Sequence, residues 1–407
     1  MDFEDTPEQA EFRQKAIEFL EEFAPQVGGQ DDSSSMYISD PAEEKAYVQR
    51  CRDWQRIKYE NGWAGLTWPK EFGGQEITGI MEGIFKEEEA KRISASGIFA
   101  VSIGMVGPTI IAHGTKEQQE HYLPRMLNGQ DCWCQLFSEP GAGSDLGGLR
   151  TMAVRDGDEW VINGQKVWTS GAQNSDWGIL LTRSDTEAVK HRGITYFLVD
   201  MTTPGIDVRP LVQITGVAHF NEVFLTDVRI PHENIVGEVH GGWAPIMTTL
   251  SNERTLIGGG GSRASMQDLF ALASRFGAAD DPRIRQKIVD VGIKIELLKY
   301  LGYRSRTAAT KGEPPGPESS ITKLSLSLLS HDIGNLVMEL CGPYGTLSSS
   351  DGVDDGRWVQ DFLSQWGVRI GGGTDNIQRN TIGEKVLGLP SEHRVDKGIA
   401  FKDIPTS

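Results

Sequence analysis

The sequence is short of the features that mark small secreted proteins, metalloproteins and membrane proteins. Its four cysteines in 407 residues are too few for a disulfide framework. Cys132 and Cys134 stand close together, but no second Cys/His cluster completes a zinc site, so we expect no metal and reduced, mostly buried thiols. No apolar run approaches the roughly 20 residues that cross a bilayer. The acidic, polar first residues resemble neither a signal nor a transit peptide, which predicts a cytoplasmic protein.

Basic residues are also scarce. Lys and Arg number 40 against 57 Asp and Glu, a formal net charge of −17 that is spread along the chain. Nucleic acids and anionic membranes are therefore poor partners, and a polyanionic ligand would need basic groups gathered at its site. With 38% hydrophobic and 24% charged residues, the composition is that of a globular protein. The length predicts two or three packed units. The sequence has no internal repeat, which argues against a solenoid.

The first third of the chain has a helical pattern. Thr6 to Gln9 is a capping box with proline at the first helical position. Thr115 to Gln118 is another, which predicts a further helix. Residues 27–41 are rich in Gly, Asp and Ser and are expected to form a long loop. After the first box, apolar residues recur on one helical face, at Phe12, Ala16, Phe19, Leu20 and Phe23.

From about residue 132 the pattern changes to short apolar segments of strand-like composition. Asp156-Gly157 and Asn163-Gly164 stand where tight hairpin turns need residues that tolerate positive φ. A compact β domain over residues 132–238 is therefore expected. The predicted strands include residues 160–162, 166–168, 179–181, 195–199 and 223–225.

After Gly241-Gly242 the helical period returns for the rest of the chain. It is broken by the proline-rich residues 311–317, which must form an interhelical loop. This part predicts a helical bundle. The chain thus divides into three expected domains, at residues 1–131, 132–238 and 239–407.

Two segments have compositions suited to ligand binding. Residues 137–145, FSEPGAGSD, lie where helices give way to strands, and their small residues open backbone N–H groups to a planar or anionic ligand. Glycine-rich loops of this kind are also common as plain turns. Residues 166–172, KVWTSGA, end a strand with an indole beside two hydroxyls, which suits packing on a flat ring. A buried tryptophan with satisfied hydroxyls would have the same sequence.

Taken together, the two segments resemble the acyl-CoA dehydrogenase family, and the resemblance runs from about residue 5 to about residue 390. It implies a multidomain α+β fold with an all-α N-terminal domain, a central β-barrel domain and a C-terminal four-helix bundle. It also implies FAD between the barrel and the bundle, an acyl-CoA substrate that is oxidised to the 2-enoyl-CoA, and electron-transferring flavoprotein as electron acceptor.

The resemblance also implies roles for individual residues. Phe137 and Ser138 would contact the pyrimidine edge of the flavin, Trp168 would lie against the ring and Ser170 would bond near N5. Ser144 would face the CoA arm. The remaining implied cofactor positions are Gly143, Thr169, Gln286, Gly342, Thr374 and Asn376.

The base of the reaction is missing from its usual family position. Many members carry a carboxylate directly before the Gly-Thr of a late segment, where this chain has Gly372. Glycine cannot take a proton, although its backbone N–H can bond the thioester oxygen. Isovaleryl-CoA and long-chain dehydrogenases carry the base on an earlier helix, directly before an arginine, and Glu253-Arg254 matches that position. The resemblance therefore implies that Glu253 takes the α proton, with burial raising its pKa.

Two departures concern the adenine end of FAD, which in homo-oligomeric members reaches a neighbouring subunit. The family's arginine before a Phe-Gly pair falls on Ala273, and Glu339 replaces a glutamine that usually helps to hold FAD. An anion there is unfavourable unless it is paired or displaced. We expect an oligomer, either a homo-oligomer or an α2β2 heteromer in which a related subunit completes the FAD site.

Other functions are compatible with the same fold. The chain could be an accessory subunit of a heteromeric dehydrogenase, or an acyl-CoA oxidase or flavin monooxygenase. A base together with flavin-ring contacts favours a catalytic chain, oxidases of this group are generally longer, and monooxygenase relatives lack a carboxylate like Glu253. Glycine at position 372 opens room near the α carbon, which hints at a branched, cyclic or steroid-derived acyl group.

Overall fold

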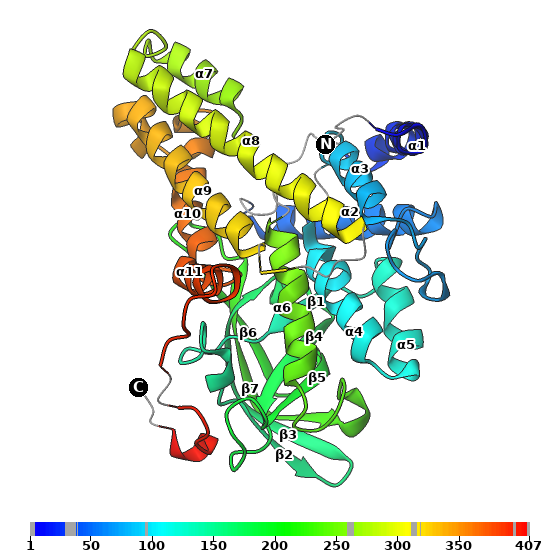
Figure 1. Ribbon diagram of the computed structural model, residues 1–407. Helices are drawn as coiled ribbons and strands as arrows, with labels where there is room; N and C mark the ends of the chain where they lie inside the picture. The colour runs from blue at the N-terminus through cyan, green and yellow to red at the C-terminus, as the bar shows by residue number, and fades with distance from the viewer. Residues whose placement is uncertain are drawn as a thin grey trace. The chain divides into compact units, whose positions relative to one another are not determined.

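The computed structural model describes residues 5–28, 38, 40–93, 97–258, 264–310, 316–317, 319–393 and 396–404 (Figure 1). The chain divides into two compact units, Met1–Asn252 with Arg394–Ser407, and Glu253–His393. Most of the two loops expected at residues 27–41 and 311–317 lies outside the described residues.

The N-terminal part of the first unit is helical, as predicted. Both capping boxes are present: Thr6 caps the first helix with Gln9, and Thr115 caps the fifth with Gln118. On the apolar face of the first helix, Ala16, Phe19 and Leu20 are buried. The helices are α1 (Pro7–Phe23), α2 (Pro41–Glu60), α3 (Gly79–Ala90), α4 (Gly107–His113) and α5 (Lys116–Leu127).

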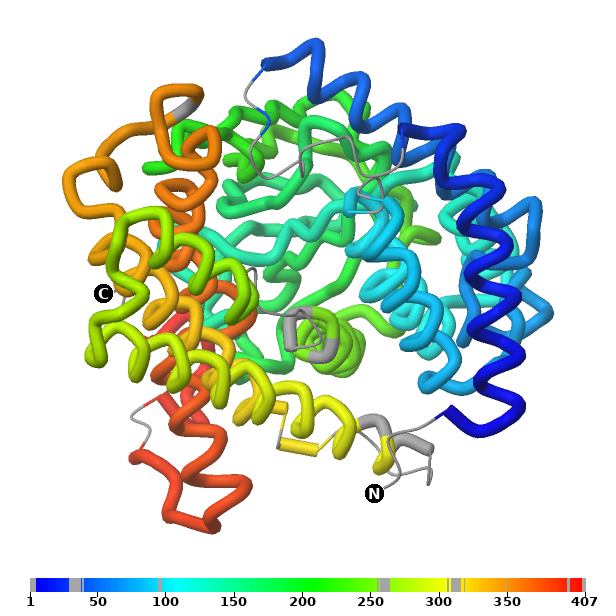
Figure 2. The backbone as a smooth tube through the Cα atoms, turned by 90° about the horizontal axis from the view of Figure 1, so that it is seen from above, coloured from blue at the N-terminus to red at the C-terminus, as the bar shows by residue number. Residues whose placement is uncertain are grey.

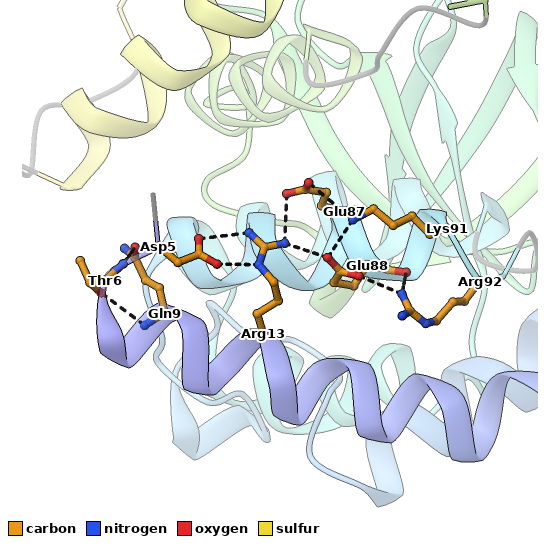
Figure 3. Close-up of polar contacts among 8 residues, drawn as sticks. All are labelled: Asp5, Thr6, Gln9, Arg13, Glu87, Glu88, Lys91 and Arg92. Atoms are coloured by element: carbon orange, nitrogen blue, oxygen red, sulfur yellow. Dashed lines mark hydrogen bonds and ion pairs between the residues drawn. The ribbon is translucent and has the colours of Figure 1, made fainter. Parts of the chain in front are cut away.

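An ion cluster joins α1 to α3 (Figure 3). The Glu88 carboxylate is 4% exposed and contacts Arg13 Nη1, Lys91 Nζ and Arg92 Nη1, each at 2.8 Å. Arg13 also contacts Asp5, with Nε 2.6 Å from Oδ2. Burial alone would raise the pKa of Glu88, but the three cations lower it to about 2. The carboxylate is therefore a stabilising link between the two helices.

We expect Glu88→Gln to lower the free energy of unfolding by about 2 kcal/mol at neutral pH, because the amide loses charge-assisted hydrogen bonds. The folded pKa of about 2 lies below the usual 4.5, so the stabilisation is present above 4.5 and is lost as pH falls toward 2. Urea titrations of both proteins at neutral pH and at roughly pH 3 measure the difference. A difference that stays constant between these pH values would contradict the assignment. Glu11→Gln, which breaks an exposed pair with Lys15, is the control.

The middle of the first unit is a curled sheet of seven strands within the described residues. The strand order is β1-β4-β2-β3-β7-β6, and β5 pairs with β4. The sheet is mostly antiparallel, but β1 runs parallel to β4. The strands are β1 (Trp133–Leu136), β2 (Met152–Asp156), β3 (Glu159–Ser170), β4 (Trp177–Arg183), β5 (Ile194–Asp200), β6 (Ile206–Leu211) and β7 (Phe220–Pro231).

One of the two predicted hairpin turns is confirmed and the other is wrong. The chain turns at Gly157, with φ 64°, between β2 and β3. Asn163-Gly164 is instead part of β3, which continues through it with a shift in register against β7. The Asn163 amide bonds Asp227 across the sheet, at 3.0 Å from Nδ2 to Oδ1. A Cβ at Gly164 would lie 2.4 Å from Thr151 Oγ1, so this glycine allows close strand contact rather than a turn.

The N-terminal helices and the sheet share one hydrophobic core. Tyr122 of α5 packs edge-on against Trp133 of β1 and Trp177 of β4, with ring centroids 5.2 and 4.9 Å apart. The two indoles stack on each other at 5.5 Å. Figure 2 shows the N-terminal helices, coloured blue to cyan, flanking the strands of this unit. The start of β1 is therefore packed against both α5 and β4.

Helices return directly after Gly241-Gly242, as predicted, with α6 (Trp243–Gly258). The second unit begins at Glu253, near the end of this helix. Side chains of α7 to α10 form one hydrophobic core, which includes Leu269, Ile288, Val337 and Trp358. None of the helices in the described ranges is long and apolar enough to span a membrane. The other helices are α7 (Met266–Arg275), α8 (Pro282–Thr310), α9 (Ser319–Cys341), α10 (Arg357–Ile370) and α11 (Asp375–Thr381).

Candidate functional site

The glycine-rich loop, residues 137–145, leaves the sheet at the end of β1. Phe137 is buried beneath it and Ser138 is half-buried. Glu139 and Ala142 exchange two backbone hydrogen bonds of 3.0 Å, which close a tight turn. The loop therefore has a packed base and a short, constrained tip.

A buried ion pair fastens the loop to β3. The Lys166 side chain is 0% exposed, and its Nζ lies 2.7 Å from Glu139 Oε1 and donates to Phe137 O at 3.1 Å. Directly beside it, Val167 N–H donates to Ser138 O at 2.9 Å. These contacts bring the two sequence segments that carry the candidate chemistry into one place.

Both members of the pair have shifted pKa values. Burial would raise the pKa of Glu139, but Lys166 and the N–H groups of Arg150 and Thr151 hold it below its usual range. Burial lowers the pKa of Lys166 to about 8, although Glu139 opposes the shift. At neutral pH the carboxylate is ionised and the ammonium is protonated, so the link is an ion pair.

Trp168 is presented on strained backbone. Its φ is 62°, a left-handed value that few bulky residues adopt. The register of β3 against β7 shifts between Lys166 and Thr169, and the shift turns the indole outward, leaving it 60% exposed. Phe220 supports it edge-on, with centroids 5.9 Å apart. A strained residue that exposes a large aromatic ring is typical of a binding site.

The surroundings of Trp168 fit a flat ligand with hydrogen-bonding edges. Thr169 is buried, and its Oγ1 has no hydrogen-bond partner among the described residues. Ser170, Gly143 and Ser144 are exposed. No atom of the described residues lies within 4 Å of a Cβ built on Gly143, so this glycine leaves open space. An isoalloxazine ring matches these features, since it offers one face to an indole and polar atoms to hydroxyls.

The late glycine segment lies in the second unit. Gly372 and Gly373 have φ values of 63° and 87°, which side chains rarely adopt. Thr374 Oγ1 accepts a bond of 3.2 Å from Ile377 N–H and so caps α11, whose first turn contains the exposed Asn376. Position 372 therefore has backbone groups close to the start of α11, but it has no carboxylate.

Sequence reasoning missed a polar network beneath this segment. Asp375 is buried and accepts from Ser327 Oγ at 2.6 Å and from Arg369 Nε at 2.9 Å. Lys323 Nζ, on a fully buried side chain, lies 3.7 Å from Asp375. Burial would raise the pKa of Asp375, but these three partners lower it. The sequence signal was an aspartate in the first turn of a helix, which does not reveal that Ser327 and Lys323 of α9 lie beside it.

Glu253 lies near the end of α6 and is half-buried, with Arg254 directly after it. One turn earlier, Thr249 Oγ1 bonds Thr109 at 2.9 Å and Tyr196 at 3.1 Å. These bonds anchor the helix within the first unit. Glu253 itself belongs to the second unit, as do all the late candidates, whereas the loop and Trp168 belong to the first.

The positions expected at the adenine end of FAD lie on the helices of the second unit. Ala273 is fully buried in the bundle core. Glu339 on α9 is ion-paired with Lys287 on α8, at 2.8 and 2.5 Å from Nζ to the two oxygens. Gln286 and Glu339 line the same surface groove between these helices. Gly342 follows α9 and has φ 52°.

The described residues contain no group of three or more His, Cys, Asp or Glu side chains that could hold a metal ion. The four cysteines are buried and form no disulfide. Burial raises the pKa of Cys132 and of Cys134 to about 12, so both remain protonated thiols.

Three domain families match the chain. The acyl-CoA dehydrogenase N-terminal domain matches residues 6–130, the middle domain 134–228 and the C-terminal domain 240–387. These matches confirm the predicted family and the predicted order of a helical, a β and a helical domain.

Individual relatives agree with this result. Acyl-CoA dehydrogenase IpdE1 of Mycobacterium tuberculosis is 37% identical over 383 residues, which is 92% of this chain and 98% of that protein. The solved structure "Tcur3481-Tcur3483 steroid ACAD" superposes with a TM-score of 0.82 and 29% identity, over 96% of this chain and 100% of that one. The ChsE4-ChsE5 complex from Mycobacterium tuberculosis gives a TM-score of 0.76 and 30% identity, with the same coverage.

Proposed function

Because this chain belongs to the acyl-CoA dehydrogenase family, we propose that it binds FAD and oxidises an acyl-CoA thioester to the 2-enoyl-CoA. The observation that carries the proposal is the exposed indole of Trp168, held at φ 62° beside the glycine-rich loop. A strained aromatic residue next to an unsatisfied hydroxyl and an open glycine is best explained by a flat ligand.

In this proposal, residues of the chain bind both the flavin ring and the rest of the FAD molecule. Phe137 and Ser138 would contact the pyrimidine edge, Trp168 would cover the ring and Ser170 would bond near N5. When bound, FAD would supply the acceptor for the β hydride. The other proposed contacts are made by Gly143, Thr169, Gln286, Gly342, Thr374 and Asn376.

Glu253 is the proposed base that takes the α proton of the substrate. Arg254 beside it favours the ionised carboxylate and helps to orient it. The backbone N–H of Gly372 bonds the thioester oxygen and so makes the α carbon more acidic. Ser144, on the exposed tip of the glycine-rich loop, contacts the CoA arm.

The acyl group is proposed to be branched, cyclic or steroid-derived. A glycine at position 372 leaves free the volume that a late carboxylate would fill. One similar solved structure is described as a steroid ACAD, which supports the same substrate class. The proposed electron acceptor is electron-transferring flavoprotein.

The test is anaerobic bleaching of the bound flavin by a panel of straight-chain, branched, cyclic and steroid side-chain thioesters. We expect bulky thioesters to bleach it fastest, and the reduced protein to pass electrons to electron-transferring flavoprotein rather than to oxygen. Rapid oxygen consumption would identify an oxidase. Absence of bleaching by any thioester would favour the accessory-subunit alternative.

The working form is proposed to be a heteromer with a related subunit. Ala273 offers no polar group. Glu339, paired with Lys287, replaces the family's usual glutamine in the groove beside Gln286. We therefore expect the chain purified alone to hold substantially less than one FAD per chain and to gain FAD with its partner, as measured by flavin absorbance. Glu339→Gln should raise the flavin content of the isolated chain, whereas Asp290→Asn in the same groove should not. Full occupancy in a homo-oligomer would remove the need for a partner.

A further inference from the structure

The C-terminal segment, residues 396–404, is docked onto the sheet unit next to the glycine-rich loop. An antiparallel bridge joins Ala400 to Val189, in the connection between β4 and β5. Phe401 N–H donates to Ala188 O at 2.9 Å. The segment is therefore attached by backbone hydrogen bonds, and its side chains have fixed positions.

Phe401 covers a buried arginine that holds the loop region. The Phe401 ring is 3% exposed, and its centroid lies 3.7 Å from Arg183 Cζ. Arg183 is 0% exposed and donates from Nη2 to Gly147 O at 2.6 Å and from Nη1 to Lys190 O at 2.8 Å. No carboxylate of the described residues lies within ion-pair distance of this guanidinium, although Glu139 acts on it from farther away. Its close contacts are therefore backbone carbonyls and the face of the Phe401 ring.

Asp396 completes a second contact with the same region. Lys190 Nζ lies between Asp396 Oδ2 at 2.6 Å and Asp145 Oδ2 at 2.5 Å. The lysine is buried, so the two carboxylates replace its lost hydration. Asp145 is the last residue of the glycine-rich loop and follows Ser144 directly. Phe401 and Asp396 thus contact Arg183 and Lys190, the two cations that bind residues 145–149.

We propose that Phe401 and Asp396 are positioning residues, which hold residues 144–149 through Arg183 and Lys190 and so set the affinity for the CoA arm of the substrate. The inference rests on the proposed function, because it assigns Ser144 to that arm. Residues 146–148 have only a single 3₁₀ turn of their own, so their position depends on these outside contacts.

The experiment compares Phe401→Ala and Asp396→Asn with the unchanged protein, all loaded with FAD. Lys402→Ala is the matched control, since Lys402 lies in the same segment but pairs with exposed Glu187. Phe401→Tyr keeps the aromatic face and should restore normal behaviour. Hydrogen exchange of residues 144–150 is measured without substrate, and KM and kcat are measured with the thioester that bleaches the flavin best.

The two test variants should exchange residues 144–150 faster and raise KM by roughly 5- to 30-fold, the loss expected for one desolvated cation–π contact or charged hydrogen bond. kcat should stay within about 3-fold, because the flavin-ring contacts lie elsewhere. Exchange in these variants equal to that in Lys402→Ala would overturn the proposal, as would a fall in kcat with unchanged KM. If no thioester bleaches the unchanged protein, the proposed function fails, and the exchange comparison alone then supports or overturns the positioning.

Discussion

Glu253→Gln is expected to slow flavin reduction by acyl-CoA by roughly 100- to 10,000-fold, the usual effect of losing a general base. The amide keeps the shape of the side chain but cannot accept the α proton. Because α6 is anchored one turn earlier by Thr249, the replaced side chain should stay in position, and FAD and acyl-CoA should still bind. Stopped-flow bleaching of the flavin measures the step directly.

Two further variants distinguish the loss of the base from a general loss of structure. Glu233→Gln changes an exposed carboxylate after β7 and should leave bleaching unchanged. Arg254→Ala should weaken substrate binding more than flavin content, because we propose that this cation orients the base. Near-normal bleaching in Glu253→Gln would remove Glu253 from the mechanism.

A base restored at the late position should rescue only part of the activity. In Glu253→Gln with Gly372→Glu, the new side chain must sit at φ 63°, and the left-handed conformation costs about 1–2 kcal/mol for a residue with a Cβ. This strain should lower both the stability of the double variant and the occupancy of the active geometry. Bleaching faster than in Glu253→Gln alone would show that a carboxylate at position 372 can also take the α proton.

Glu139→Gln is expected to have the largest effect on stability, a loss of about 3–5 kcal/mol, because it leaves the Lys166 ammonium buried without a counter-ion. Lys166 is 0% exposed and its pKa is already lowered to about 8, so the unpaired group should lose its proton more easily still. The glycine-rich loop should then detach from β3, with a loss of bound flavin. Urea denaturation and flavin absorbance measure the two effects.

The exposed pair of Arg229 with Glu159 provides the comparison within the same sheet. Its atoms lie 2.9 Å apart, but both side chains are about half exposed, so Glu159→Gln should cost less than about 1 kcal/mol. Replacing both buried partners, in Glu139→Gln with Lys166→Met, should recover part of the lost stability because no buried charge remains. Equal losses in the exposed and the buried single variants would contradict the role of the buried pair.

Local signals in the sequence predicted local structure well. A capping box needs only residues three apart, so Thr6 and Thr115 identified two helix starts correctly. The predicted segments fall in β3, β4, β5 and β7, whereas β1, β2 and β6 were not among them. β1 has only four residues, and β2 and β6 bury few of their side chains, so none of the three gives a clear pattern. Asn163-Gly164 was misread because the contacts that straighten it, with Asp227 and Thr151, come from distant parts of the chain.

The candidate site was predictable only as a set of residue types. The sequence predicted that Trp168 contacts a ring, and this role stays a prediction. The positive φ of Trp168 depends on a register shift between β3 and β7 that no local pattern encodes. The contacts of Asp375 with Ser327 and of Phe401 with Arg183 could not be predicted either, since these partners lie far away in the chain. The roles of Glu253, Arg254 and Gly372 are still predictions, because they depend on bound ligands.

The burial of all four thiols has a chemical consequence for an enzyme with the proposed product. A 2-enoyl thioester is an electrophile that thiolates attack at the β carbon. Cys132 and Cys134, with pKa values raised to about 12, present almost no thiolate at neutral pH, and burial raises the pKa of Cys51 and Cys341 as well. The protein should therefore resist alkylation by its own product over many turnovers.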